Sequence, residues 1–497
     1  MLFNSFQFLV FFPAVTLVYF IIPRKARYLW LLLASYIFYM CWNVKYVVLL
    51  AASTLITWTC GQLVDSFRKP TLRKLIMAGG ILSNLFILFF FKYFDFFLDN
   101  INALLDILHI AAVDNPFHYL LPVGISFYTF QALGYLIDVY RGDTRPERNL
   151  LRYALFVSFF PQLVAGPVER SKSLLTQLRN VDNVDRKHLL NHERISTGFT
   201  MMIWGLFQKM VIADRLAIFA DTVFSNAFAC GTVETILGAA AFSLQIYCDF
   251  AGYSCVAVGA ARVMGFDLME NFNTPYFAVS ISDFWRRWHI SLSTWFRDYV
   301  YIPLGGNRRG RGRKYGNLMA TFLVSGLWHG ANWTYVVWGG LHGLYQIMGD
   351  VLKPVRTWLI EKCGVKTDTE SFHLGRIVLT FCLTAFAWIF FRAQTISDAL
   401  YYICRMLTKW NPWVLFDQSL YGWGLDTTEF HILAAALLLL LLVDLVRYKK
   451  QTDIGHFLYR QNLWFTWAAV IALIVCTLVY GEYGILFDSK QFIYFAF

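Results

Sequence analysis

The feature that most restricts the fold of this chain is a series of long apolar runs separated by short, mostly basic segments. Runs of about 17 to 25 apolar residues have the length that a helix needs to cross the hydrocarbon core of a bilayer. A spanning segment must be a helix or part of a closed barrel, because its backbone polar groups find no water in lipid. With 58% hydrophobic residues and a mean hydropathy of +0.49, the chain is predicted to be an all-α polytopic membrane protein. We expect one multi-spanning domain over residues 1–497.

The basic residues cluster between the apolar runs, as they do in the cytoplasmic loops of membrane proteins. The net charge of +11 is therefore explained by membrane topology, and no nucleic-acid partner is expected. Cytoplasmic loops are predicted where the clusters lie, which places both termini outside a multi-pass protein of the cell membrane. The predicted helices cover 6–22, two segments that begin near residues 28 and 46, 75–97, 120–140, 195–212, 235–258, 318–351, 377–391, 430–446 and 463–480.

Two segments do not have the composition of a span. Residues 156–167 form an apolar run of a dozen residues interrupted by Pro161, Gly166 and Pro167. Such a run is too short to cross and is predicted to be a re-entrant segment buried in protein. Residues 171–194 are polar and of mixed charge, which is typical of a cytoplasmic surface helix or loop.

The stretch from residue 283 to 333 contains the unusual chemistry of the chain. Aromatic and leucine side chains recur at three- and four-residue steps over 283–299, which predicts one helix with an apolar stripe lying in the headgroup region. The stripe comprises Trp285, Trp288, Leu292, Trp295 and Tyr299, and Arg286, Arg287 and Arg297 flank it. His289 shares this helix and is a candidate second catalytic group, ligand contact or surface histidine.

A polar loop over 305–314 follows, with Asn307 and five basic side chains among four glycines. Backbone freedom and positive charge suit a phosphate group or anionic lipid heads. A simple cytoplasmic loop explains the same charges. The loop matches neither a P-loop nor a dinucleotide-binding glycine pattern.

Two ionisable residues stand inside apolar runs, where they are costly and usually functional. His329 is a candidate general base, because a neutral imidazole accepts a proton without first carrying charge. It is equally well explained as a core histidine bonded to a neighbouring carbonyl. Asp249 requires a partner or a water-filled cavity. Structural pairing with a tyrosine or a backbone amide and contact with substrate are both open, and Tyr253 lies one turn further on. The nine cysteines lie singly, so no metal site is expected.

These residues carry a family resemblance. The segments 284–289 (FWRRWH), 302–307 (IPLGGN) and 327–330 (LWHG), with 161–167 (PQLVAGP) and 249–254 (DFAGYS), resemble the membrane-bound O-acyltransferase (MBOAT) family. Within it they are most similar to the alginate O-acetyltransferase branch. The resemblance implies a helical bundle with re-entrant segments and a transmembrane tunnel. By the same resemblance His329 is the catalytic histidine and His289 the second motif histidine.

The activity that this resemblance implies is O-acetylation of an extracytoplasmic polysaccharide such as alginate. Acetyl-CoA is the expected donor substrate at the cytoplasmic side, with no bound cofactor, and His329 would act as general base. An extracytoplasmic protein that relays the acetyl group or acetylates the glycan is the expected partner, besides membrane lipid. Trp285, Arg286, Arg287, Arg297 and Asn307 are the candidate donor-binding residues, and Asn332, Asp249 and Tyr253 are candidates for the tunnel or acceptor side.

Three alternatives stay open from the sequence. A D-alanyl transferase of the same family would take its donor from a carrier protein. A lipid or protein acyltransferase would use the same histidine with another acceptor. A transporter of glycan or acetyl groups would explain the helices and Asp249, but not two histidines on either side of a cationic loop.

Overall fold

The structure is a computed structural model that describes residues 1–117, 121–164, 166–185 and 189–483. These residues form α-helices joined by short 3₁₀ and π-helical segments and contain no strand, which confirms the all-α prediction for them. Five helical segments among them are long and apolar enough to cross a membrane, so the chain is a multi-pass membrane protein. They are Val44–Ser66, Pro70–Ile107, Glu370–Arg392, Thr427–Lys450 and Leu463–Tyr480.

The other predicted spans are helical but do not meet that criterion of length and apolarity. The helices α1 (Phe6–Ile21), α2 (Arg27–Met40) and α6 (Ile125–Arg141) have 14 to 17 residues, fewer than the roughly 20 that a straight crossing needs. The helices α11 (His192–Phe207) and α13 (Thr232–Met264) contain the predicted segments 195–212, in part, and 235–258. The sidedness of the termini stays a prediction, and the last residues of the chain lie outside the described part.

The chain divides into two compact units. Unit 1 comprises Met1–Phe199 with Ala257–Met269, and unit 2 comprises Thr200–Val256 with the described part of Glu270–Phe497. The chain passes from one unit to the other within α11, within α13 and again between Met269 and Glu270. The expected single domain over 1–497 stays a prediction.

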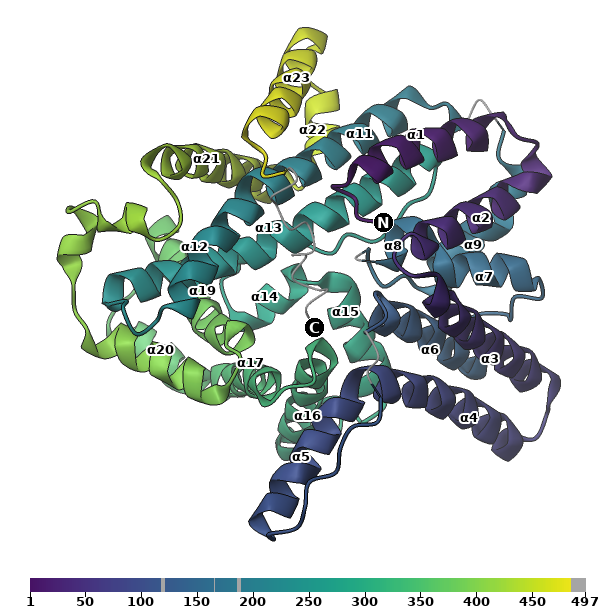
Figure 1. Cartoon of the computed structure of the whole chain (residues 1–497), viewed down its shortest axis with the longest axis horizontal. Helices are drawn as coiled ribbons and strands as arrows, with labels where there is room; N and C mark the ends of the chain where they lie inside the picture. The colour runs from purple at the N-terminus through teal and green to yellow at the C-terminus, as the bar shows by residue number, and fades with distance from the viewer. Residues whose placement is uncertain (118–120, 165, 186–188, 484–497) are drawn as a thin grey trace. The chain divides into compact units, whose positions relative to one another are not determined.

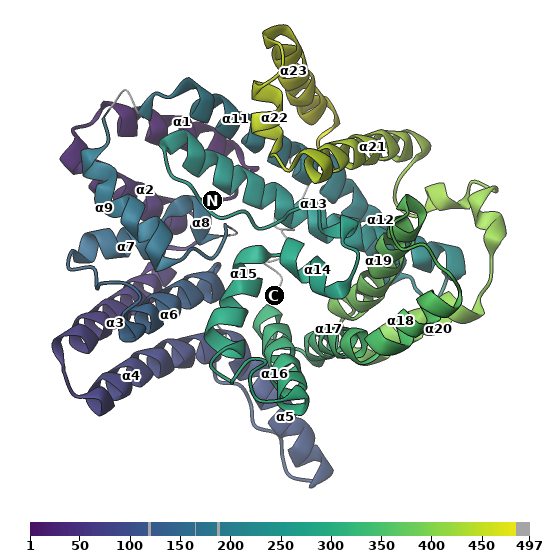
Figure 2. The same cartoon turned by 180° about the vertical axis from the view of Figure 1, so that it is seen from behind.

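Unit 1 contains a group of three neighbouring helices, α3 (Val47–Ser66), α4 (Pro70–Leu88) and α6, which lie side by side in Figures 1 and 2. A Cβ atom at Gly80 of α4 would lie 2.7 Å from Leu136 Cδ2. Small residues allow such close approach of helices that have no hydrophobic driving force between them in lipid. A π-helical segment, Phe89–Tyr93, connects α4 to α5 (Phe94–Ile107).

The predicted break over 156–167 is present. Two short helices, α7 (Leu150–Ser158) and α8 (Phe160–Leu163), meet there, and Pro161 stands in the first turn of α8. The described residues of this stretch are buried, and Ala165 lies outside the described part. Its re-entrant nature stays a prediction. The segment 171–194 begins with a π-helical turn, Ser171–Leu175, and α9 (Thr176–Asn180).

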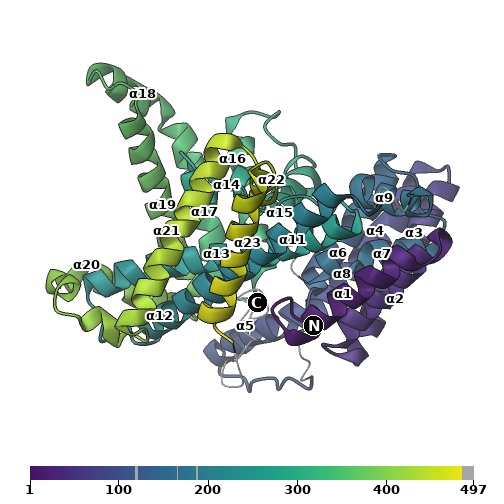
Figure 3. The same cartoon turned by 90° about the horizontal axis from the view of Figure 1, so that it is seen from above.

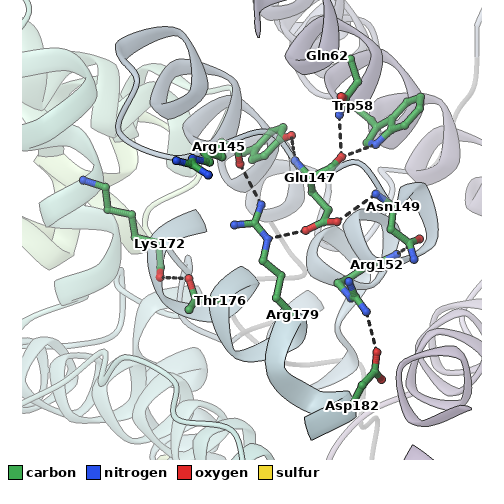
Figure 4. A network of polar contacts seen from close by, with 11 residues as sticks. Trp58, Gln62, Arg145, Glu147, Asn149, Arg152, Lys172, Thr176, Arg179 and Asp182 are labelled. Atoms are coloured by element: carbon green, nitrogen blue, oxygen red, sulfur yellow. Dashed lines mark hydrogen bonds and ion pairs between the residues drawn. The ribbon is translucent and has the colours of Figure 1, made fainter. Parts of the chain in front are cut away.

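Glu147 fixes the chain before α7, as Figure 4 shows. Its backbone carbonyl accepts hydrogen bonds from Trp58 Nε1 at 2.8 Å and Gln62 Nε2 at 2.7 Å. Its carboxylate pairs with Arg179 Nε at 2.6 Å and accepts from the Asn149 N–H at 3.0 Å. The loop between α6 and α7 is therefore tied to α3 and to α9.

A second buried carboxyl of unit 1, Glu169, titrates in an unusual range. The side chain is 2% exposed, and its Oε1 accepts a hydrogen bond from the Met269 N–H at 2.5 Å. Burial raises the pKa of this carboxyl from 4.5 to about 7, because the charged form loses its hydration. Between those two pKa values the folded protein holds a proton that the unfolded chain has released. The stability of the fold therefore decreases as the pH rises through this window and stays lower above it.

The substitution Glu169→Gln is expected to remove this pH dependence, since the amide keeps an oxygen for the Met269 N–H and cannot ionise. At pH 8 the variant should be more stable than the wild type by up to ~3 kcal/mol, and at pH 5 by much less. Thermal unfolding of both proteins at the two pH values in one detergent measures the difference. An equal difference at pH 5 and pH 8 would contradict the assignment.

Unit 2 contains most of the helices after α13. A helical hairpin is formed by α16 (Arg311–His329) and α17 (Trp333–Val351), and α19 (Glu370–Arg392) packs against α17. Figure 3 shows α18 (Lys353–Lys362) leading away from the ends of α17 and α19. Nearly all of its side chains are exposed. Further helices of this unit are α12 (Asp214–Ser225), α20 (Ile396–Thr408), α21 (Thr427–Lys450), α22 (Ile454–Tyr459) and α23 (Leu463–Tyr480).

The part of α13 in unit 2 is buried on nearly all sides, and small residues make this packing possible. A Cβ atom at Gly252 of α13 would lie 2.6 Å from the backbone carbonyl oxygen of Gly205 in α11. Glycine is therefore required where the two backbones touch. This contact places the polar side of α13, with Asp249 and Tyr253, in the protein interior.

Candidate active site

His289 lies between two short helices rather than on one long helix. The helix α14 (Ile281–Arg287) ends before it, and α15 (Ile290–Phe296) begins directly after it. Its φ of 42° falls in the left-handed region, which a residue with a side chain rarely adopts and which costs of the order of 1–3 kcal/mol. The prediction of one continuous helix over 283–299 is wrong.

Four of the five side chains of the stripe are buried in protein, and Tyr299 is partly exposed. Trp285 is 9% exposed, Trp288 0%, Leu292 1% and Trp295 6%. The stripe therefore packs into the interior of unit 2 and does not face lipid headgroups, as an interfacial helix would. The helical spacing predicted correctly which side chains share an apolar environment, but not what covers them.

His329 is the last residue of α16, at the turn into α17. Three glycines bring the two helices together. A Cβ atom at Gly326 would lie 2.3 Å from Tyr335 O, one at Gly339 2.3 Å from Phe322 O, and one at Gly330 2.1 Å from the Tyr335 ring. Because no side chain fits at these positions, the glycines determine where the imidazole of His329 lies.

The rings of His289 and His329 face a common aromatic shell. Their centroids are 6.4 Å apart, and the side chains are 0% and 3% exposed. Trp328 and Trp338 each lie 5.0 Å from the His329 ring and Phe391 lies 5.4 Å away, all nearly perpendicular to it. Phe250 of α13 meets the His289 ring edge to face at 4.6 Å. The structure therefore brings together the two histidines that the sequence singled out.

Burial controls the charge of His289. It lowers the pKa of this imidazole to about 3, because the aromatic surroundings disfavour the charged form. His289 is therefore neutral at physiological pH. A neutral ring can hold or polarise a ligand through hydrogen bonds, whereas it supplies no charge.

A third histidine, His342 of α17, belongs to the same shell and was not predicted. It is fully buried, and its Nδ1 accepts a hydrogen bond from Trp285 Nε1 at 3.3 Å. The indole N–H can only donate, so the neutral His342 carries its proton on Nε2. Trp338 links this histidine to His329, with ring centroids 5.1 and 5.0 Å away. The signal in the sequence that could have indicated His342 is the group of glycines around it, Gly339, Gly340 and Gly343, which is similar to the glycines near His329.

The predicted donor-binding residues differ in their surroundings. The indole N–H of Trp285 donates a hydrogen bond to His342, and the guanidinium of Arg287 pairs with Asp283 at 3.1 Å. Arg297 is exposed and pairs with its neighbour Asp298 at 2.8 Å. Arg286 and Asn307 are exposed. Donor binding by these side chains stays a prediction.

The basic loop is shorter than predicted, because α16 already begins at Arg311. Three glycines before it, Gly305, Gly306 and Gly310, have positive φ, a conformation that glycine adopts without strain. Cations in the first turn of a helix oppose its dipole. Lys314 compensates by pairing with Asp350 of α17 at 2.7 Å.

Asp249 pairs with a lysine, whereas the partners considered from the sequence were a tyrosine and a backbone amide. Its Oδ1 lies 2.6 Å from Lys209 Nζ, and the same ammonium lies 2.8 Å from Asp214 Oδ1. All three side chains are at most 5% exposed. Lys209 projects from a π-helical segment, Gln208–Ala213, a type of distortion that often marks functional positions. Tyr253 is buried one helical turn after Asp249.

Asn332 serves as the N-cap of α17. Its Oδ1 accepts from the Thr334 N–H at 3.0 Å, and its Nδ2 donates to the Gln394 carbonyl at 2.9 Å. Both polar groups of the side chain are thus used in the fold. The predicted place of Asn332 at the tunnel or acceptor side stays a prediction.

The helical membrane fold and the two buried histidines identify the class of protein. Residues 147–391 match the membrane-bound O-acyltransferase family. With relatives of high identity over most of its length, the chain belongs to this family and is a membrane-bound O-acyltransferase. The transporter alternative is therefore excluded as the sole activity.

Three relatives show the range of activities in the family. The chain is 43% identical to the probable alginate O-acetylase AlgI of Pseudomonas putida, over 80% of this chain and 79% of that protein. It is 37% identical to the peptidoglycan O-acetyltransferase of Helicobacter pylori, over 80% and 78%. It is 30% identical to the teichoic acid D-alanyltransferase of Streptococcus thermophilus, over 50% and 60%.

Proposed function

We propose that this protein transfers an acetyl group from acetyl-CoA at the cytoplasmic side, through a transmembrane tunnel, for O-acetylation of an extracytoplasmic polysaccharide. The observation that carries the proposal is the pair of buried histidines, 6.4 Å apart between ring centroids, in a chain of an O-acyltransferase family. The similarity to O-acetylases, which extends over about four fifths of both chains, favours acetyl as the transferred group. An extracytoplasmic protein that receives the acetyl group is the expected partner.

In this mechanism His329 is the general base, a role typically worth ~10² to 10⁴ in rate. It removes the proton of the acceptor hydroxyl, whose oxygen then attacks the thioester carbonyl carbon. The C–S bond breaks, and the departing CoA sulfur takes the proton back from His329. His289, neutral in its aromatic surroundings, holds or polarises the thioester. Arg286, Arg297 and Asn307 are exposed and are proposed to contact the phosphates of the donor.

The alternative donor is a D-alanyl group on a carrier protein. It is supported by more distant relatives, such as the teichoic acid D-alanyltransferase of Streptococcus thermophilus, 60% of whose length this chain covers. The exposed basic loop suits the phosphates of CoA and the acidic surface of a carrier protein alike. The acetyl reading is preferred because the more similar relatives are O-acetylases.

Incubation of the purified protein with ¹⁴C-labelled acetyl-CoA and a soluble polysaccharide as the hydroxyl acceptor, such as an alginate oligomer, tests the donor. We expect release of free CoA at least tenfold above that of a protein-free control. In cells, mass spectrometry of surface glycans should show O-acetyl groups that disappear when the protein is deleted. Absence of CoA release, together with transfer from a D-alanyl-loaded carrier protein, would replace the acetyl proposal by the alternative.

A further inference from the structure

A short segment of unit 2, residues 271–273, pairs with the chain on both sides of His289. The backbone N–H of Ile290 donates to the Asn271 carbonyl at 2.9 Å, and the N–H of Asn273 donates to the Arg287 carbonyl at 2.9 Å. These bonds bracket the left-handed residue. The break between α14 and α15 is therefore held from outside those helices.

The side chain of Asn271 adds two further bonds and is 1% exposed. Its Nδ2 donates to Ser254 Oγ of α13 at 2.7 Å, and its Oδ1 accepts from Ser291 Oγ of α15 at 2.6 Å. A single buried amide thus joins the helix that carries Phe250 to the helix that follows His289. Buried hydrogen bonds of this kind are costly to leave unmade.

The residue after Asn271 supports the ring of His289. Phe272 packs on Phe250 and on Trp288, with centroids 5.0 Å away in both cases. Phe250 in turn meets the His289 ring at 4.6 Å. The segment that ties the backbone of His289 therefore also fixes the aromatic face against which its imidazole rests.

The conformation that Asn271 opposes is a continuous helix. The apolar spacing over 283–299 fits such a helix, and no glycine or proline interrupts it near His289. A helix running through this point would remove the strain of the positive φ. Successive side chains would then differ in direction by about 100°, as in any α-helix, so the side chains near the break would change direction. The His289 ring would then leave its place 6.4 Å from His329.

We propose that Asn271 is a positioning residue for acyl transfer, which holds the backbone break that directs the His289 imidazole toward the same space as His329. This rests on the proposed function, in which His289 holds or polarises the donor. Asn271 touches neither reacting group and acts through His289. A displacement of about 1 Å in such a group can cost 10²-fold in rate.

A double-mutant cycle on the full-length protein tests the proposal, with acetyl-CoA as the probe, the same polysaccharide as the acceptor and release of CoA as the readout. Asn271→Ala is expected to lower kcat by ~10- to 100-fold with a smaller change in KM. In a His289→Ala background the same substitution should lower kcat less than threefold further, because the group that Asn271 positions is already absent. Non-additivity of this kind distinguishes positioning from general destabilisation.

Asn84→Ala is the matched control for loss of a buried amide. Asn84 is also 1% exposed, accepts from Ser53 Oγ at 2.5 Å and donates through Nδ2 to the Gly80 carbonyl, but lies in unit 1. Its kcat per folded protein should stay within twofold of the wild type. If Asn271→Ala does not fold, Ser291→Ala removes one of the two side-chain bonds and should lower kcat in the same non-additive way.

The outcomes separate the two proposals. Wild-type activity of His289→Ala would remove His289 from the proposed mechanism and with it the role of Asn271. Loss of activity in His289→Ala, combined with unchanged kcat in Asn271→Ala, would overturn the positioning role alone. An equal fold-loss from Asn271→Ala in both backgrounds would also overturn it.

Discussion

His329→Ala is expected to lower the rate of CoA release from acetyl-CoA by at least 10²-fold, and up to about 10⁴-fold, while the protein still inserts into the membrane and folds. Without the imidazole, the described shell offers only weak or occupied bases besides its Trp and Phe rings. Burial lowers the pKa of His289 to about 3, and Nδ1 of His342 accepts the Trp285 N–H. The rate at saturating acetyl-CoA is the appropriate measurement, since a base acts on the chemical step.

Truncation of His329 also leaves a hole, because the ring is packed among three aromatic side chains and is 3% exposed. Loss of a side chain of this size from a core typically costs 2–5 kcal/mol. His329→Gln fills more of the space and cannot act as a base, so it should be better folded than the alanine variant and equally inactive. His456→Gln, outside the shell, serves as the matched substitution. Activity of His329→Gln above a tenth of the wild-type rate would remove His329 from the mechanism.

Much of the helical framework could be predicted from the sequence, because long apolar runs leave a chain in lipid few alternatives. The predicted segment 463–480 has the bounds of α23, and the predicted 6–22 differs from α1 by one residue. The broken stretch after α7 followed from Pro161. The family resemblance singled out His289 and His329, whereas their proximity in space is a finding of the structure.

The break of the helix at His289 could not be predicted from the sequence. A period of three to four residues is preserved on both sides of the break, so the pattern reads as one helix. The conformation is imposed by hydrogen bonds from Asn271 and Asn273, more than ten residues away in sequence. Tertiary bonds therefore override the local preference at the position where the proposed chemistry requires a particular direction of the side chain, as strain at functional sites commonly does.

Only one of the three members of the charge cluster around Lys209 could be recognised from the sequence. Asp249 was recognised as costly, whereas Lys209 lies 40 residues earlier and Asp214 follows in the next helix. The three side chains form a buried group of one cation and two anions. In surroundings of low polarity each charge loses its hydration, so the ammonium is what makes two neighbouring carboxylates tolerable. The cluster joins the π-helical segment Gln208–Ala213 to α12 and α13.

Lys209→Met is therefore expected to be among the most destabilising substitutions in the chain, at about 3–5 kcal/mol, because it leaves two buried carboxylates without their shared cation. A fall in Tm on the order of 5 °C or more should follow. Asp249→Asn should be milder, since Lys209 keeps Asp214 as a partner. The double variant Lys209→Met/Asp249→Asn should recover part of the loss, because it restores the single net negative charge of the wild-type cluster.

Thermal unfolding of the four proteins in one detergent measures this order. The matched control is Lys172→Met, which breaks an exposed pair with Asp143 at 3.3 Å, with side chains 60% and 44% exposed. Exposed pairs contribute at most ~1 kcal/mol, so its Tm should stay close to that of the wild type. If Lys209→Met were no less stable than Lys172→Met, the two carboxylates would have to be protonated or hydrated, and the cluster would not hold the π-helical segment against α13. Partial recovery in the double variant would instead show that electrostatics, rather than the lost volume of the lysine side chain, determines the stability of this part of unit 2.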